Sequence, residues 1–281
     1  MRRSRWTGPL VHAGLVLVCA ATLYPVLWVV GMALSPGQGA LTGLWPLPAH
    51  PTLSNFRELL GATDAAGHLL FLRQLGNSIL VSGLSTAVGM LLSMSAAYAM
   101  SRFEFAGRRA GLTALLATQM FPGTMMIVPL YAIMNHLGLL NSVGGLVLVY
   151  ATTSMPFCVW MLKGYFDTIP RDLEEAALLD GASHGQIFRR VVLPLARPAL
   201  AVTALFSFMT AWNEFILAAT FLDDESRFTA PVALQRFVGA YKTEWGHFAA
   251  GAIVVSVPVM ALFFALQKHL VGGLTAGGVK G

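Results

Sequence analysis

Three long stretches of this sequence contain no charged residue. They run from residue 6 to 56, from 74 to 101, and from 110 to 162, where 53 consecutive residues lack a formal charge. About 20 predominantly apolar residues cross the hydrocarbon core of a membrane as a helix, so the last stretch is long enough for two crossings. Only 11% of the 281 residues are charged, against about 25% in a typical soluble domain. The chain is therefore predicted to be an integral membrane protein.

Six membrane-spanning helices are expected from these stretches and from the apolar segments after residue 197. A polar break at residues 136–142, with Gly138 and Asn141, divides the longest stretch into two spans. The fifth span contains Glu214, the only formal charge within a predicted span. The expected spans are residues 10–34, 77–100, 113–134, 143–162, 198–221 and 248–267.

The N-terminus has one alternative interpretation, a cleaved signal peptide, because Arg2, Arg3 and Arg5 precede the first apolar run. The apolar region of a signal peptide is about 7–15 residues long, whereas this run continues to Met32. A retained first span is therefore favoured.

The basic residues are concentrated in alternate loops. If the N-terminus is cytoplasmic, 13 of the 18 Lys and Arg residues fall in cytoplasmic segments. The positive-inside rule therefore predicts that both termini are cytoplasmic, and it explains the net charge of +5 without nucleic acid. The largest extracytoplasmic segments are then residues 35–74 and 222–247, and the largest cytoplasmic one is 163–197.

Segment 163–197 has the pattern of two short helices joined by a tight turn. Pro170 and the acidic residues after it favour the start of a helix, and Gly181 can adopt the left-handed conformation that ends one. Ser183 and Gln186 form a capping-box pattern for a second helix, which carries Phe188. The element is expected to expose a face of small and aromatic residues, which indicates a partner site. An amphipathic hairpin resting on lipid headgroups is the alternative.

The same segment carries a gapped motif of fixed spacing. It reads Glu175-Ala176-Ala177, three residues, Gly181, nine residues, Val191, one residue and Leu193-Pro194. This motif resembles the EAA loop of ABC importer permeases, and Val191 in place of Ile is its only departure. The resemblance implies an all-α integral membrane protein with six transmembrane helices, the type I ABC importer permease fold, and cytoplasmic EAA coupling helices.

In that family the EAA loop, here about residues 167–197, docks into a separate ATP-hydrolysing subunit. The resemblance implies two roles for its residues. Phe188 would lie at or near the contact, and the following residues would hold the shape of the loop: Glu175, Ala176, Ala177, Gly181, Leu193 and Pro194.

Two further stretches resemble the carbohydrate-uptake branch of the family. They are residues 211–215 and the C-terminal residues 273–281. The resemblance implies a sugar substrate, with maltose or a maltodextrin expected first and trehalose, other oligosaccharides and glycerol phosphate as the alternatives. It also implies that the C-terminal tail, with Gly277, Lys280 and Gly281, reaches the ATPase subunits.

The resemblance also implies a heteromeric complex in a bacterial cytoplasmic membrane. Its members would be this chain, a second homologous permease, two ATPase subunits that bind ATP and Mg²⁺, and an extracytoplasmic solute-binding protein. The expected organisation of this chain is an N-terminal part with the first span (residues 1–72), a permease core (73–270) and a cytoplasmic tail (271–281).

Candidate residues for the translocation path are Pro122, Asn213 and Glu214. An acid within a span usually faces a bundle interior or a water-filled cavity, although snorkelling to the outer interface is an equal alternative for Glu214. Pro122 is expected to kink the third span.

The resemblance further implies that the binding protein contacts Asp223, Asp224 and Glu225; a solvated acidic loop is the alternative for these three residues.

The chain carries no sign of its own energy source or active site. None of its four lysines follows a glycine, so the Gly-Lys of a phosphate-binding loop is absent. Cys19, Cys158 and the seven histidines show no metal-ligand spacing. A non-catalytic permease is therefore expected, without a cofactor or metal of its own. The alternative is a secondary transporter driven by an ion gradient through Glu214, which predicts broken helices at the membrane midplane.

Overall fold

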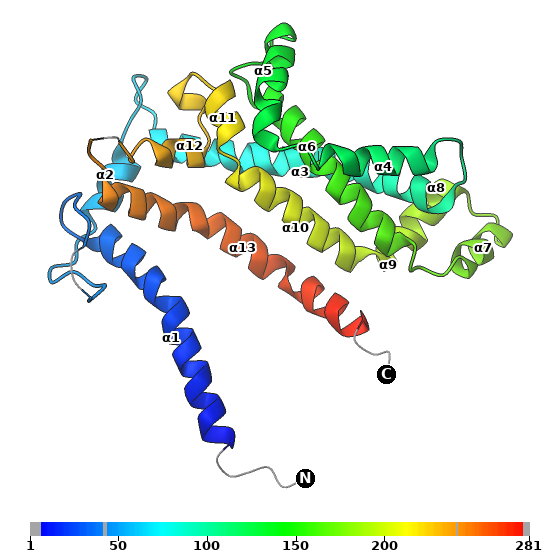
Figure 1. The fold of residues 1–281 in the computed structure, drawn as a ribbon, viewed down its shortest axis with the longest axis horizontal. Helices are drawn as coiled ribbons and strands as arrows, with labels where there is room; N and C mark the ends of the chain where they lie inside the picture. The colour runs from blue at the N-terminus through cyan, green and yellow to red at the C-terminus, as the bar shows by residue number, and fades with distance from the viewer. Residues whose placement is uncertain (1–6, 42–43, 240, 278–281) are drawn as a thin grey trace. The chain divides into compact units, whose positions relative to one another are not determined.

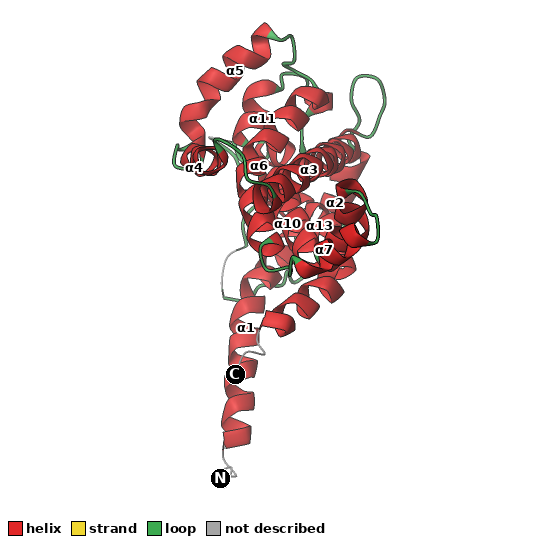
Figure 2. Cartoon of the chain, turned by 90° about the vertical axis from the view of Figure 1, so that its right-hand side faces the viewer, coloured by secondary structure: helices red, strands yellow, loops and turns green. Residues whose placement is uncertain are grey.

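The structure is a computed structural model that describes residues 7–41, 44–239 and 241–277. These residues form helices joined by turns and loops, and within them the only β-type pairing consists of isolated bridges (Figures 1 and 2). Four helices are long and apolar enough to cross a membrane: α1 (Thr7–Leu34), α3 (Leu70–Arg102), α6 (Val143–Phe166) and α13 (Trp245–Gly277). They correspond to the predicted first, second, fourth and sixth spans.

The remaining helices are shorter and include two bent pairs. The first, Arg108–Thr118 with Gly123–His136, overlaps the predicted third span. The second joins His184–Leu195, in the segment predicted to be cytoplasmic, to Arg197–Asn213, which overlaps the predicted fifth span. Counting each bent pair as one span gives up to six spans within the described residues. The shorter helices are α2 (Ser54–Gly61), α4 (Arg108–Thr118), η1 (Gly123–Met126), α5 (Ile127–His136), α7 (Asp172–Leu179), α8 (His184–Ile187), η2 (Phe188–Val192), α9 (Leu193–Leu195), α10 (Arg197–Asn213), α11 (Ile216–Phe221), η3 (Glu225–Arg227) and α12 (Ala230–Gln235).

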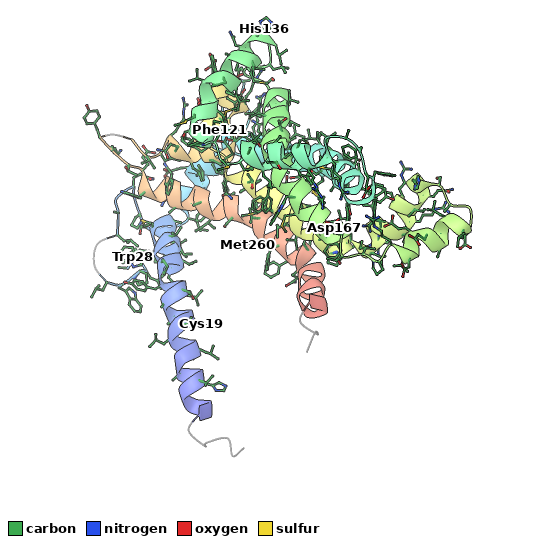
Figure 3. The ribbon with its side chains drawn as sticks, turned by 45° about the vertical axis from the view of Figure 1, so that its right-hand side comes forward. Cys19, Trp28, Phe121, His136, Asp167 and Met260 are labelled. Atoms are coloured by element: carbon green, nitrogen blue, oxygen red, sulfur yellow. The ribbon has the colours of Figure 1, made fainter. Side chains whose placement is uncertain are left out.

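The third predicted span is not one kinked helix. Helix α4 ends at Thr118, and the chain turns by 97° before η1 and α5 begin. Pro122 is the residue that precedes η1, where its fixed φ and missing N–H stop the helix from continuing. Figure 3 labels Phe121 at this break.

The fifth predicted span also differs from the expectation of a helix that runs through Glu214. Helix α10 ends at Asn213, and Glu214 has an extended backbone with ψ of 126°. The Glu214 carboxylate instead accepts hydrogen bonds from the backbone N–H groups of Leu217 (2.8 Å) and Ala218 (3.1 Å). A side chain that caps the next helix in this way competes with helix continuation, so α11 begins as a separate helix.

The chain divides into two compact units, residues 1–73 with 232–257 and residues 74–231 with 258–281. The core of the first unit contains Ala33 of α1, Leu59 of α2 and Ala249 of α13. Asn55 is 1% exposed there, and its side-chain amide donates to the carbonyls of Ala33 (3.0 Å) and Ser35 (2.9 Å).

The second unit is built around α6, which packs along α10. Small side chains allow α6 to approach both α10 and α3 closely. The Ser207 hydroxyl of α10 donates to the Ser154 hydroxyl of α6 at 3.4 Å. On α3, a Cβ added to Gly89 would lie 3.4 Å from the same Ser154 oxygen. Small residues at such contacts are typical of helix packing in membranes.

The packing of Asn55 generates a prediction about Gly246. A Cβ at Gly246 would lie 2.6 Å from the Asn55 amide atoms, so Gly246→Ala must displace Asn55 from its two carbonyl partners. We expect a loss of about 1–3 kcal/mol in the free energy of unfolding, measured as a lower thermal transition of the detergent-solubilised protein. The matched control is Gly83→Ala, where no atom lies within 4 Å; equal melting of the two variants would contradict the prediction.

Candidate functional site

The segment between α6 and α10, which we call the EAA loop (residues 167–197), is shaped by the turn chemistry of its own sequence. Gly181 has φ of +83°, and the N–H groups of Gly181 and Ala182 donate to the carbonyls of Leu178 (3.0 Å) and Ala177 (2.9 Å). These two bonds form a Schellman motif, which ends α7. The predicted role of Gly181 as a helix terminator is confirmed.

The second helix of the loop begins at the predicted capping box. The Ser183 N–H donates to the Gln186 side-chain oxygen (2.8 Å), and the Gln186 N–H donates to the Ser183 hydroxyl (3.4 Å). Helix α8 continues into η2, a π-helix, and then into α9. The direction changes by 81° where α9 meets α10, at Ala196, which lies between Pro194 and Pro198.

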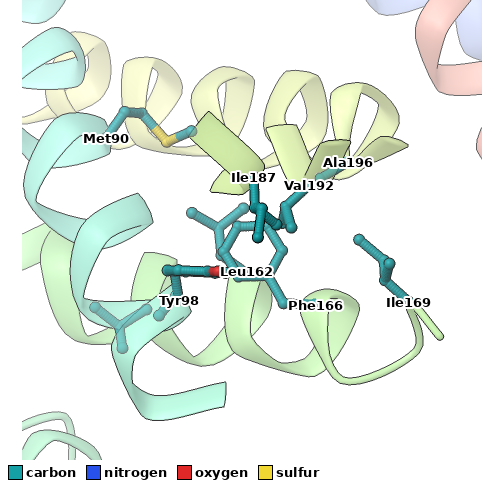
Figure 4. Close-up of a cluster of buried hydrophobic side chains, with 10 residues drawn as sticks. Met90, Tyr98, Leu162, Phe166, Ile169, Ile187, Val192 and Ala196 are labelled. Atoms are coloured by element: carbon teal, nitrogen blue, oxygen red, sulfur yellow. The ribbon is translucent and has the colours of Figure 1, made fainter. Parts of the chain in front are cut away.

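The inner face of the EAA loop packs on the ends of α3 and α6. Ile187, Val192 and Ala196 are buried in a cluster with Leu162 and Phe166 of α6 (Figure 4). This cluster fixes α8, η2 and α9 against the rest of the second unit.

Phe188 joins the same cluster, which corrects the predicted exposed aromatic face. Its ring lies 4.7 Å from that of Tyr98 and meets Phe166 edge to face at 6.5 Å. Phe188 therefore anchors the loop, and its predicted contact with an ATPase stays a prediction.

A buried ion pair attaches α7 to the end of α3. The Arg102 Nε lies 2.5 Å from the Glu174 Oε1, and the two side chains are only 7% and 10% exposed. The other carboxylate oxygen accepts from the Tyr98 hydroxyl at 3.0 Å, and the Arg102 Nη2 donates to the Ile169 carbonyl at 3.1 Å. Such hydrogen bonds help to offset the free energy lost when two charged groups are removed from water.

A second polar network adjoins the ion pair. The Ser101 hydroxyl donates to Asp167 (2.6 Å) and accepts from Arg102 (3.0 Å), while the Lys163 ammonium donates to Asp167 (2.5 Å). Burial of Asp167 opposes its ionisation, but the hydrogen bonds from Lys163 and Ser101 outweigh that effect and lower its pKa. Figure 3 labels Asp167 at this junction. The carboxylate is therefore ionised at neutral pH and holds the end of α6 to the end of α3.

Neither Glu174 nor Arg102 was singled out as a site residue from the sequence. The available signal was weak: Arg102 is the first charge after a long uncharged stretch, and Glu174 lies three residues before Ala177 on the inner face of α7. The two lie 72 residues apart, so only tertiary structure shows that they pair.

The outer face of α7 carries the motif residues. Glu175 and Ala176 are exposed, whereas Ala177 packs on the cluster below. Leu178 is 43% exposed and Leu179, beside the Gly181 turn, is 90% exposed. An apolar tip of this kind on a charged loop indicates a contact surface for another molecule.

Glu214 lies at a second candidate site, a cavity of about 710 Å³ in the second unit. One carboxylate oxygen also accepts from the Tyr150 hydroxyl at 2.5 Å. The cavity is lined by Phe121 and Gly123 on either side of Pro122. The structure therefore brings Glu214 and the Pro122 turn together at this cavity. Asn213 is exposed and its side-chain amide donates back to the Met209 carbonyl; its place on the translocation path stays a prediction.

The acidic segment Asp223, Asp224 and Glu225 is exposed beside the α5–α6 turn. The Asn141 side-chain oxygen accepts from the N–H groups of Asp223 (3.4 Å) and Asp224 (3.3 Å), and the Arg227 guanidinium donates to the Asn141 carbonyl. The segment is therefore held in place.

Of the predicted tail residues, Gly277 ends α13, and Lys280 and Gly281 lie outside the described residues.

The chain is similar to proteins of one transport family. A family profile described as binding-protein-dependent transport system inner membrane component matches residues 89–275. The trehalose transport system permease protein SugB of Mycobacterium tuberculosis is 38% identical over 94% of this chain and 95% of its own length. The maltose/maltodextrin transport system permease protein MalG of Vibrio parahaemolyticus is 38% identical over 96% and 95%.

A solved structure shares the fold. A chain of a bacterial ABC transporter involved in the import of the acidic polysaccharide alginate superimposes with a TM-score of 0.79 at 24% identity, over 95% of this chain and 99% of that one.

The ion pair generates a prediction about stability. Glu174→Ala leaves the Arg102 guanidinium buried without its partner, so we expect a loss of about 3–5 kcal/mol in the free energy of unfolding. The matched control is Glu175→Ala, one residue along and exposed, which should change stability by no more than about 0.5 kcal/mol. Thermal unfolding of the two solubilised variants is the measurement; a Glu174→Ala protein as stable as the control would contradict the role of the ion pair.

Proposed function

The chain belongs to the family of binding-protein-dependent transport system inner membrane components, and we propose that the sugar it helps to import is maltose or a maltodextrin. It is a multi-pass inner-membrane permease subunit of an ABC sugar importer, and it is itself non-catalytic. The likeness to MalG over almost the whole chain supports the choice of maltose. SugB is similar to the same degree, so trehalose is the first alternative sugar.

The EAA loop is proposed to couple this chain to a separate ATPase subunit. The observation that carries the proposal is the exposed face of α7, where Glu175, Ala176 and Leu179 point away from a loop that is otherwise firmly attached. A docking element must be exposed at its contact and rigid behind it, because a flexible loop would absorb a displacement instead of transmitting it. The cluster around Ile187 and the Arg102–Glu174 pair provide that rigidity.

The complex is proposed to contain a second, MalF-like permease, two MalK-like ATPase subunits and an extracytoplasmic solute-binding protein. ATP and Mg²⁺ would be bound by the ATPase subunits alone. Both termini of this chain would be cytoplasmic, as the distribution of Lys and Arg favours, and the tail with Lys280 and Gly281 would approach the ATPases. The binding protein would contact the fixed acidic segment at Asp223, Asp224 and Glu225.

One observation favours the alternative of an ion-gradient-driven transporter. The helix does break at Glu214, as that alternative predicts. Its carboxylate, however, is occupied by a hydroxyl and two N–H donors, which suits a fixed anchor better than a carrier of protons.

Loss of the EAA geometry should uncouple transport. Gly181→Val combined with Glu175→Ala places a β-branched residue at φ of +83°, which is strongly disfavoured, and removes the exposed carboxylate. We expect sugar uptake to fall to background while the protein is still inserted in the membrane. The control is Gly185→Ala in α8, where no atom lies within 4 Å; normal uptake by the double variant would refute the coupling role.

Purification of the chain from its native membrane tests the class of transporter. We expect an ATPase with a phosphate-binding loop and a second permease to co-purify, and ATP hydrolysis to rise with maltose-loaded binding protein more than with the trehalose-loaded protein. A chain that purifies alone, and drives sugar uptake into proteoliposomes on an ion gradient, would contradict this proposal and favour the alternative through Glu214.

A further inference from the structure

The loop between α1 and α2 runs back along α1 instead of leaving the helix end directly. The Tyr24 hydroxyl donates to the Leu44 carbonyl at 2.8 Å. The Pro46 carbonyl lies so close to α1 that a Cβ added to Gly31 would overlap its oxygen, so the approach requires glycine at this position. Figure 1 shows the loop beside the C-terminal half of α1.

These contacts place the loop at levels where α1 lies in the membrane. Counted back from Leu34, the last residue of α1, Gly31 is three residues away and Tyr24 is ten, which is roughly 4.5 and 15 Å along a helix. Both positions fall within Val11–Leu34, the part of α1 that is apolar enough to span. The loop therefore reaches below the end of a membrane-spanning helix, on the extracytoplasmic side in the orientation proposed above.

The side chains that the loop presents at these levels are apolar and exposed. Leu44 is 89% exposed and Trp45 is 73% exposed, and Leu47 is exposed as well. Between the two contact points on α1, Val26 and Leu27 are also exposed. The loop and the helix thus expose apolar side chains at the same depth.

We propose that residues 44–47 insert among lipids at the boundary between the headgroups and the acyl chains, and that they fix the depth of α1 in the membrane. Trp45 suits this boundary, because its ring is largely apolar while its N–H can bond to the wet headgroup region. Leu44 lies nearest the middle of α1 and contacts acyl chains. Anchors of this kind set the depth and tilt of membrane-spanning helices. The proposal holds whichever sugar is imported.

The loop also meets the condition that backbone close to the hydrocarbon must satisfy its polar groups within the protein. The bond between Tyr24 and the Leu44 carbonyl gives both groups a partner where water is scarce. Pro46 and Pro48 have no backbone N–H to satisfy. Residues 6–56 contain no formal charge, so the loop brings none toward the acyl chains.

Electron paramagnetic resonance of the complete complex in lipid vesicles tests the proposal. A nitroxide is attached to Leu44→Cys, a change that keeps the backbone carbonyl to which Tyr24 donates. The Cys19→Ser background removes the exposed native thiol, and Cys158 is fully buried; accessible cysteines of the partner subunits are replaced as well. Collisions of the nitroxide with oxygen, which concentrates in acyl chains, are compared with collisions with a water-soluble nickel chelate.

The expected result is an oxygen-to-nickel collision ratio at Leu44→Cys close to that at Val26→Cys on α1. The ratio should be several-fold higher than at Tyr241→Cys, the matched control, which is a fully exposed position in the loop before α13. Leu47→Cys, next to the residue that meets Gly31, should give an intermediate ratio. Trp45→Cys is a second position in the same patch and should also exceed the control.

Two results would overturn the proposal. A ratio at Leu44→Cys equal to that at Tyr241→Cys would show that the loop lies in water. A nitroxide that is immobilised and reached by neither reagent would show that a protein, the second permease or the binding protein, covers the patch. Stimulation of ATP hydrolysis by sugar-loaded binding protein is measured on the same samples, so that failure of the anchor is distinguished from loss of the assembled importer.

Discussion

The buried pair of Arg102 and Glu174 is the interaction on which the rest of this structure depends. It joins the end of a membrane-spanning helix to the first turn of α7. The Tyr98 hydroxyl donates to the second carboxylate oxygen of Glu174, and the Ile169 carbonyl accepts from the Arg102 guanidinium. Breaking a pair this deeply buried strongly destabilises the fold, because removal of one partner leaves the other charge buried without compensation. The loop that carries the EAA motif therefore cannot move without α3.

The need to give every buried polar group a partner within the protein also governs the membrane-spanning part of the second unit. Polar backbone must be satisfied within the protein, and where α10 ends, the Glu214 carboxylate accepts the N–H groups that start α11. At the other break, Pro122 has no N–H to satisfy. Each interruption is thus stabilised locally. Small residues such as Gly89 and Ser154 let the surrounding helices approach closely.

The sequence predicts the parts of this fold that are encoded locally. Charge-free stretches place the spans, and the turn chemistry of Gly181, Ser183 and Gln186 defines the EAA loop. Two features differ from the expectation. Glu214 ends a helix that apolar composition would continue, because its carboxylate accepts the N–H groups that start α11. Phe188 packs inward against Tyr98 and Phe166, which are distant in sequence. The Arg102–Glu174 pair joins positions too distant in sequence for any local pattern to indicate.

The most direct test of the central claim is a cross-link from the tip of α7. A photoreactive group attached to Leu179→Cys, in the Cys19→Ser background, should form an adduct with the ATPase subunit of the assembled complex, because Leu179 is the most exposed apolar residue of the loop's outer face. The account predicts that this adduct is lost in the Gly181→Val variant, which breaks the turn beside it. Adducts with lipid alone, in a complex that still hydrolyses ATP, would contradict the claim that the EAA loop is the docking element.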